Sequence, residues 1–506
     1  MPHIAKTTQE RVEMKKSNEM CSIGEFSLEE GLWVPGELKL DGDATHVKLF
    51  SKSQIDWQSK REICGRLHDL TKVTLLECVP MSGTADHFKG RDRFYVGNLF
   101  PHFVLVGNEH LVSTERRVTK IKFSVEDGAT VFGTVRAFGS VSNADEHLNS
   151  LSKVEDGKYI GEVGPHPQLF YFNGKTKILS VETVLGAISA HYGLHLPSPN
   201  ANGIRVEADV YLLIEFRDAK SFKEAIRALT EFLRFVELAA GRPQNVREVA
   251  VELDGDTSER SNWLDVHWSL GPRRSTDGEL DASHRFDLPF NPLEEPAQFD
   301  KVLSTWLERR DDWRDARMRF ATSFACQRLY GTDRLVGSAN MFDLIPDTAF
   351  PPEGPLAATL SEARDAAREL FRRLPDSADR SSVLGALGRI GKLSLKKKVR
   401  NRVLLVASRT GDLFPELAFV TDHAIDCRNY YVHGTRPKLD YSSGTDPVSF
   451  FTDTLEFVFA ISDLVDAGWH AYGCLGRYTT MSHPFGRYRA SYAENLAELK
   501  KLKAFD

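Results

Sequence analysis

The C-terminal half of the chain contains the stretch Asp426-Cys-Arg-Asn-Tyr-Tyr-Val-His-Gly434. It is typical of the end of a helix, because glycine readily adopts the left-handed conformation that follows a last helical turn. An arginine, an amide and a histidine lie here beside two tyrosines and a valine. This polarity is unusual for a helix end, and the rest of the chain is best interpreted outward from it.

Helical patterns surround this stretch and no strand pattern interrupts them. We predict helices over Val302–Phe324, Ala357–Arg373, Ser382–Ile390, Ser394–Gly411, Pro415–Gly434, Pro447–Ala467 and Glu494–Lys503. The segment Pro447–Ala467 is apolar on nearly every side, as expected for a helix buried inside a bundle. Residues 299–506 are therefore predicted to form an all-α bundle.

The first half of the chain has the alternating and β-branched patterns of strands. Strands are predicted at Leu32–Leu40, His46–Phe50, Lys72–Val79, Phe94–Leu105, Arg117–Val125, Thr130–Ala137, Lys158–Gly161, Lys177–Val181, Gly203–Phe216, Val249–Leu253 and Trp263–Leu270. An amphipathic helix is predicted over Ser221–Ala240. The fold class is thus α+β, with a β-rich domain over residues 1–270, a proline-rich linker over 271–298 and the helical domain over 299–506.

Composition limits the functional classes. A chain of 506 residues usually forms more than one domain. Its net charge is −6, so no global basic excess indicates a nucleic-acid or membrane partner, and any such site must be local. The six cysteines are scattered without metal-ligand or disulfide spacing, and no apolar run is long enough to span a bilayer. We expect a cytoplasmic protein with reduced thiols.

The helix over Pro415–His433 carries a polar stripe of Asp422, Asp426, Asn429 and His433. A solvated face on an ordinary bundle helix would look the same. Arg428 lies roughly 140° around an ideal helix from His433. We therefore expect the two side chains to converge only if the histidine leaves the helical path, for which Gly434 provides an exit.

Arginine and histidine together suit the cleavage of RNA without a metal. Histidine can take a proton from a ribose 2′-hydroxyl or give one to the departing 5′-oxygen. The guanidinium of Arg428 suits a phosphate whose charge grows in the transition state, and Asn429 could add a neutral donor or orient the imidazole. The products would be a 2′,3′-cyclic phosphate and a 5′-hydroxyl. The chain offers three other Arg–His pairs at similar spacing, and only Arg428 has a following asparagine and a glycine behind the histidine.

Several neighbouring residues are candidates for supporting roles. Asp422 and Asp426 could position His433 or bind only water, and Tyr431 lies within the motif. A basic cluster precedes the motif helix, and a solvated helix face is its ordinary interpretation. Because it is the densest positive stretch in an acidic chain, we predict RNA-backbone contacts and salt-sensitive binding for its members Lys396, Lys397, Lys398, Arg400 and Arg402.

The run R-N-Y-Y-V-H at Arg428–His433 resembles the R-x(4–6)-H motif of the HEPN ribonuclease superfamily. The stretches Gly31–Leu40 and Gly65–Cys78 resemble the N-terminal domain of ApeA-like proteins, which precedes a C-terminal HEPN domain. The resemblance implies antiphage, abortive-infection defence by a nuclease that cuts host RNA, with tRNA as the expected class. It implies Arg428 and His433 as the catalytic pair and Asn429 as the polar motif residue.

The resemblance also implies chemistry without a metal or other cofactor, and a homodimer in which the motifs of two protomers face each other across one cleft. We expect a phage-derived trigger among the partners, and we expect no membrane partner. One alternative is a non-catalytic HEPN-type adaptor that only dimerises or binds RNA. A second alternative gives the main activity to the β-rich domain, as a ligand-binding or hydrolytic module, but no nucleophile elbow or phosphate loop occurs there.

Overall fold

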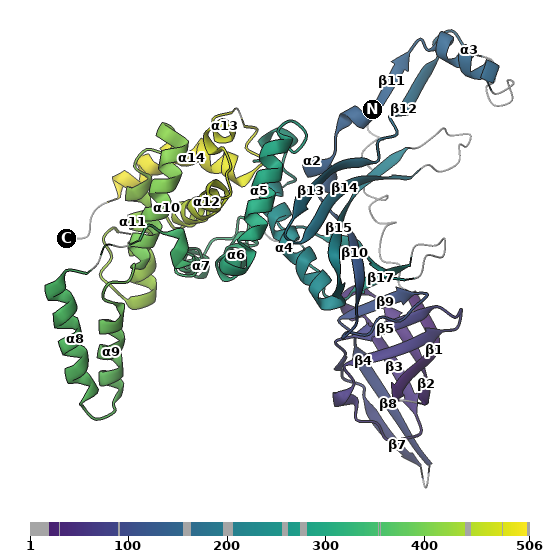
Figure 1. Ribbon diagram of the computed structural model, residues 1–506, viewed down its shortest axis with the longest axis horizontal. Helices are drawn as coiled ribbons and strands as arrows, with labels where there is room; N and C mark the ends of the chain where they lie inside the picture. Colours follow the sequence, from purple (N-terminus) through teal and green to yellow (C-terminus); the bar gives the residue numbers. More distant parts are fainter. Residues whose placement is uncertain are drawn as a thin grey trace. The chain divides into compact units, whose positions relative to one another are not determined.

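The computed structural model describes residues 20–29, 31–89, 92–154, 163–195, 206–255, 262–273, 281–352, 354, 356–440, 447–477 and 479–502. The chain forms two compact units (Figure 1). The first comprises Met1–Arg274 with Phe290–Leu307, and the second comprises Ser275–Pro289 with Glu308–Asp506. The first unit is rich in strands and the second is helical, which confirms the predicted α+β class. The segment 271–298, predicted as a linker, is divided between the two units.

The β-rich unit contains one sheet of 15 strands, all paired antiparallel, in the order β13-β14-β15-β10-β16-β17-β9-β5-β4-β1-β2-β3-β8-β6, with β7 paired to β8. Its strands are β1 Met20–Glu29, β2 Leu32–Leu40, β3 His46–Ser51, β4 Glu62–Leu67, β5 Lys72–Leu76, β6 Val79–Pro80, β7 Ala85–Lys89, β8 Asp92–Phe100, β9 Phe103–Gly107, β10 Arg116–Val125, β13 Lys177–Thr183, β14 Gly186–His195, β15 Glu207–Ser221, β16 Val246–Leu253 and β17 Trp263–Trp268. A separate hairpin pairs β11 Phe138–Ser142 with β12 Gln168–Phe172.

Strands β1 to β5, β8 and β9 contribute side chains to one apolar core. Along β2, inward Val34 and Leu38 alternate with exposed neighbours, as a one-sided sheet requires. Phe26 is fully buried, and a Cβ on Gly65 would lie 2.5 Å from its ring. Glycine at position 65 therefore leaves the space that the phenylalanine fills.

Helix α4, Phe222–Ala240, contacts β10 and β15 and confirms the amphipathic helix predicted over Ser221–Ala240. The Ser221 hydroxyl accepts from the Glu224 amide while the Glu224 carboxylate accepts from the Ser221 amide, forming a capping box. Gly241 then ends the helix with φ 79°.

Two strand predictions in this unit need correction. The segment Thr130–Ala137 is not a strand, because its start belongs to helix α2, Gly128–Phe132, whose Val131 and Phe132 are buried. Tertiary burial here outweighs the β preference of threonine and valine. The predicted single strand Phe94–Leu105 is two strands, β8 and β9, separated at Pro101, where proline cannot donate to a ladder. The predicted strand Lys158–Gly161 lies outside the described residues.

The helices that follow are α5 Pro296–Glu308, α6 Arg310–Phe324, α7 Thr332–Asn340, α8 Ala358–Arg372, α9 Ala378–Arg389, α10 Leu395–Thr410, α11 Leu417–His433, α12 Val448–Asp466, α13 Ala471–Leu475 and α14 Pro484–Lys501. The predicted single helix over Val302–Phe324 is wrong: α5 and α6 are separate, and the boundary between the compact units lies at their junction. Helix α7 was not predicted, whereas Ser394 caps α10 as predicted.

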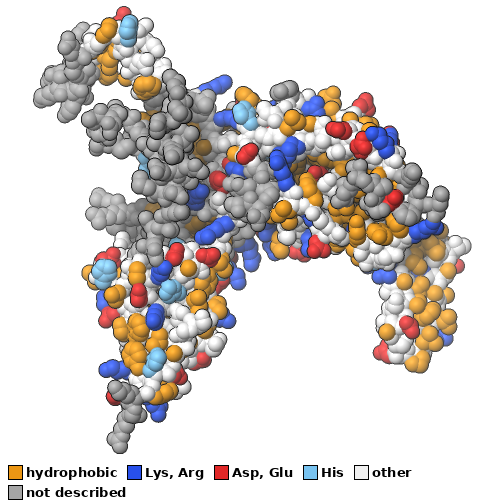
Figure 2. All heavy atoms as spheres, turned by 180° about the vertical axis from the view of Figure 1, so that it is seen from behind, with side chains coloured by type: hydrophobic (Ala, Val, Ile, Leu, Met, Phe, Trp, Pro, Cys, Tyr) orange, Lys and Arg blue, Asp and Glu red, His pale blue; other side chains and the backbone are white. Residues whose placement is uncertain are grey.

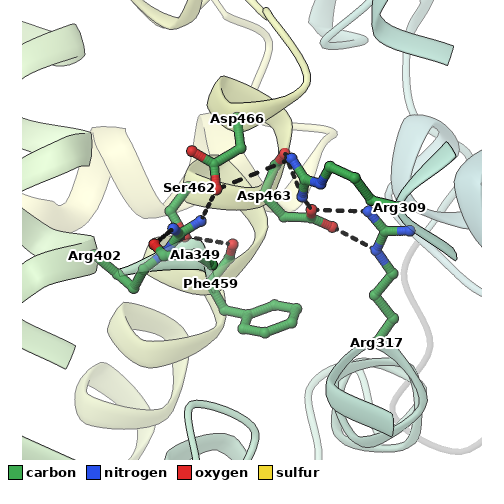
Figure 3. Close-up of polar contacts among 8 residues, drawn as sticks. All are labelled: Arg309, Arg317, Ala349, Arg402, Phe459, Ser462, Asp463 and Asp466. Atoms are coloured by element: carbon green, nitrogen blue, oxygen red, sulfur yellow. Dashed lines mark hydrogen bonds and ion pairs between the residues drawn. The ribbon is translucent and has the colours of Figure 1, made fainter. Parts of the chain in front are cut away.

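Helix α12 is the centre of the bundle and is buried on nearly all sides, as predicted from Pro447–Ala467. Its Asp463 carboxylate accepts bonds of 2.8 and 2.9 Å from Arg317 of α6 and also binds Arg309 (Figure 3). Burial alone would raise the pKa of Asp463, but the charges of Arg317 and Arg309 outweigh it and the pKa is lowered. One turn away, Arg402 of α10 binds Asp466 at 2.5 Å. These ion pairs hold α6 and α10 against α12.

Helices α8 and α9 form a hairpin that contains no buried residue. In Figure 2, hydrophobic side chains gather along it. Leu360 and Leu370 of α8 have exposed fractions of 48% and 62%. Among the described residues, no helix is both long and apolar enough to cross a membrane.

Replacing Asp463 by asparagine should strongly destabilise the helical unit. The buried Arg317 guanidinium would lose its counter-charge and the partly exposed Arg309 its closer one, which costs about 3–5 kcal/mol of unfolding free energy. Because the folded pKa of Asp463 is lowered, its contribution is present above the unfolded value of about 3.9 and is lost as pH falls through the folded value. Denaturant unfolding followed by far-UV circular dichroism measures both effects.

The matched control is Glu498→Gln, which removes an exposed i,i+3 pair with Lys501 on α14 and should change stability by less than about 1 kcal/mol. Equal stability of Asp463→Asn and the native chain would contradict the role assigned to this ion network.

Candidate active site

Helix α11 positions the Arg–His motif. Its inward face buries Val420, Ala424 and Cys427, which pack it into the bundle against α7, α10 and α12. Gly434 ends the helix with φ 62°, and its amide donates to the Tyr430 carbonyl at 3.0 Å. The capping glycine therefore acts as the sequence predicted.

The Arg428 guanidinium contacts three polar side chains. Nη1 lies 3.0 Å from His433 Nε2 and donates at 3.0 Å to Asn429 Oδ1. Nη2 donates at 2.8 Å to Asn340 Oδ1. Arginine has donors only, so Nε2 of His433 can act only as the acceptor in this contact.

The contact between Arg428 and His433 confirms that the two side chains meet, but the expected route was wrong. The helix continues through His433 and turns only at Gly434. The long arginine side chain spans the angular separation instead, and the histidine does not leave the helix.

Asn340 was missed by sequence reasoning. It is the last residue of α7, 88 positions before Arg428. Helix α7 is short and gave no clear periodic signal, and an asparagine at a helix end is common without any function. Only the packing of α7 on α11 brings this amide to the motif.

The closest polar partners of Arg428 are two amides and an imidazole. Among the described residues, no carboxylate forms an ion pair with its guanidinium. Its Nε is buried without a hydrogen-bond partner in that same part of the chain. Burial raises the pKa of Asp343, while the charges of Lys398 and Arg428 act to lower it. A guanidinium held by neutral oxygens and an imidazole is available to an anion.

Asp422 and Asp426 bind cations of the basic cluster, and within the described part of the chain no hydrogen bond or ion pair joins them to His433. Asp422 accepts a 2.9 Å bond from Arg400 Nε. Asp426 lies 3.3 Å from Lys396 and accepts at 2.7 Å from Lys438. Their described contacts therefore organise the cations of α10 and the loop after α11, and do not orient the imidazole.

The basic cluster does not present a single face. Lys398 and Arg402 are 9% and 2% exposed. Lys398 donates to the Asp343 carbonyl, and Arg402 belongs to the ion network of Figure 3. Both lie inside the bundle, which argues against the predicted RNA contacts for these two. Lys397 and Arg400 are exposed on α10, and Lys396 is partly exposed beside them.

The surface next to the motif is partly apolar. Tyr431 and Val432 have exposed fractions of 41% and 42%, so Tyr431 does not continue the buried stripe of α11. Cys427 is buried. Across the described ranges, no three His, Cys, Asp or Glu side chains gather in a group that could hold a metal ion.

Two family profiles match the chain. The profile described as ApeA N-terminal domain 1 matches residues 21–306. The profile described as Apea-like HEPN matches residues 336–471, which include Asn340, Arg428 and His433. No curated protein and no solved structure matches the chain.

Proposed function

Because this chain belongs to the ApeA-like HEPN proteins, we propose that it is a metal-independent endoribonuclease of abortive-infection antiphage defence. HEPN domains of this kind indicate a defence nuclease, and the specific chemistry rests on the motif. The observation that carries the proposal is the Arg428 guanidinium, which two amide oxygens hold next to the Nε2 atom of His433. We place the reaction in the cytoplasm, where host RNA, with tRNA as the expected class, is the substrate.

In the proposed reaction, an RNA phosphate replaces His433 as a partner of Arg428. The freed Nε2 then takes the proton of the 2′-hydroxyl, whose oxygen attacks phosphorus. The bond from phosphorus to the 5′-oxygen breaks, and this oxygen receives a proton from an acid. In a homodimer with facing motifs, the protonated His433 of the second protomer would be that acid.

Charge at the surface supports RNA binding by part of the predicted cluster. Lys397, Lys396 and Arg400 lie on the accessible side of α10. Asp422 and Asp426 neutralise two of these cations in the free protein, and phosphates would compete with the two carboxylates. Binding should therefore weaken as salt increases. The β-rich unit is proposed to sense a phage-derived trigger and to regulate the nuclease.

Purified protein should cleave tRNA in the presence of EDTA and leave 2′,3′-cyclic phosphate ends. Arg428→Ala should lower the rate by about 10²–10³-fold, because it removes the donor to the phosphate. His433→Ala should lower it by about 10²–10⁴-fold through loss of proton transfer. End-group analysis and initial rates measure these effects.

The control is Arg409→Ala, which removes an exposed arginine from the far end of α10 and should retain activity. A substrate with a 2′-deoxy sugar at the cleaved position should resist cleavage. Full activity of either motif variant, with fold and oligomeric state intact, would leave the non-catalytic adaptor as the better description.

Asn340→Asp tests why neutral acceptors surround Arg428. The change keeps the shape of the side chain but places a carboxylate 2.8 Å from Nη2. The resulting ion pair should neutralise the guanidinium and reduce cleavage by about tenfold or more, while the stability of the fold is maintained or increased. Asn340→Ala is the matched variant and should have the smaller effect on the rate. Equal activity of Asn340→Asp and the native protein would show that charge at this position is irrelevant.

Val432→Asp tests the proposed dimer. Val432 is exposed next to His433, so a dimer with facing motifs would bury it, and a charge there should shift the protein to monomers. Sedimentation velocity measures the shift, and cleavage should fall with it. Leu70→Asp adds the same charge at a 71% exposed leucine of the β-rich unit and should leave the oligomeric state unchanged. Native-like dimers of Val432→Asp would place the interface elsewhere.

A further inference from the structure

The helical unit contains a cavity of about 790 Å³ that is separate from the Arg–His motif. Helices α6, α7, α12 and α14 and the loop after α6 line it, and none of its lining residues belongs to α11. This volume lies in the range of about 300–1,000 Å³ that is typical of small-molecule sites.

Aromatic rings form much of the cavity wall. Phe320 and Phe324 of α6 stack on each other, and their ring centroids lie 5.1 Å apart. The ring centroids of Phe457 in α12 and Tyr488 in α14 lie 4.4 Å apart. All four line the cavity. Such a wall suits a planar ring system that can stack on aromatic faces.

Two arginines give one part of the cavity a positive charge. Arg328 is exposed and forms no ion pair within the described part of the chain. Arg487 donates through Nη1 to the Ser482 carbonyl at 2.8 Å. Burial, and next the charge of Arg328, lower the pKa of Arg487. Two guanidinium groups that repel each other would gain from an anion placed between them.

Hydrogen-bond acceptors also line the cavity, and the charge of one of them, Asp453, acts to raise the pKa of Arg487. Gln327 is 6% exposed, and its Oε1 is buried without a hydrogen-bond partner among the described residues. Asp453 accepts from the Tyr330 hydroxyl at 2.8 Å, and its side chain is 39% exposed. An orphaned buried acceptor costs free energy unless a donor reaches it. The ligand should therefore carry an N–H donor. Glu456 is already paired with Arg334, and Glu494 adds one further carboxylate to the lining.

We propose that this cavity binds a nucleotide. The base would stack on the aromatic wall, its amino group would donate to Gln327 and Asp453, and its phosphate would lie at Arg328 and Arg487. The ligand can be a free nucleotide or an unpaired nucleotide of an RNA strand, since both present the same chemistry. The proposal does not depend on cleavage by Arg428 and His433.

Isothermal titration of the full chain with AMP, GMP, CMP, UMP, ATP, GTP and inorganic phosphate tests the site. At least one nucleotide should bind the native chain and His433→Ala equally. Ala490→Trp, which fills the cavity from an exposed lining position, should abolish binding. Arg328→Glu should weaken it by about tenfold or more through loss of a charge-assisted bond. Arg409→Glu, the same charge change outside the cavity, should have no effect.

A second arm uses a short single-stranded RNA with His433→Ala, so that no cleavage occurs. The site would be supported, with RNA as its ligand, if the chain bound RNA but no mononucleotide. Ala490→Trp should then reduce RNA binding, and Arg409→Glu should not. The proposal would be overturned if neither ligand bound, if Ala490→Trp and Arg328→Glu bound like the native chain, or if phosphate alone bound as tightly as any nucleotide. Normal RNA cleavage alongside these failures would leave the proposed nuclease intact.

Discussion

A carboxylate buried between two guanidinium groups must keep both partners, because any one of these charges alone would be costly inside the bundle. Asp463 has this position between Arg309 and Arg317, and the neighbouring Asp466 holds Arg402. The requirement fixes α6 and α10 against α12, which is buried on nearly all sides. Helices α7 and α11 pack on the same central helix, so the placement of the motif depends on this charge balance.

The bundle uses arginine in two chemically different ways. Arg317 and Arg402 bind carboxylates and hold helices together. Arg428 binds two amide oxygens and an imidazole nitrogen, so its charge stays available. This distinction separates the structural Arg317 and Arg402 from the proposed catalytic Arg428. Arg402 leaves the predicted RNA-binding set because it is buried and bound to Asp466, although it lies in the densest basic stretch of the sequence.

Helix α7 contributes to both candidate sites of the helical unit. Arg334 near its start lines the cavity and binds Glu456, and Asn340 at its end holds Arg428. The two residues are fewer than two helical turns apart. A displacement of this short helix would therefore alter the surroundings of Arg428 and of the cavity together.

The sequence by itself determined the α+β class, the amphipathic helix on the sheet, the buried α12 and the glycine that ends the motif helix, because each depends on local periodicity or capping. It also singled out Arg428, Asn429 and His433. The tertiary structure alone decided that Asn340 completes the site, that Asp422 and Asp426 bind cations of the basic cluster, and that Lys398 and Arg402 point inward. These outcomes depend on which helices meet and at what rotation. Helix α2 has a similar origin, because the burial of Val131 and Phe132 outweighed the β preference that the sequence displays.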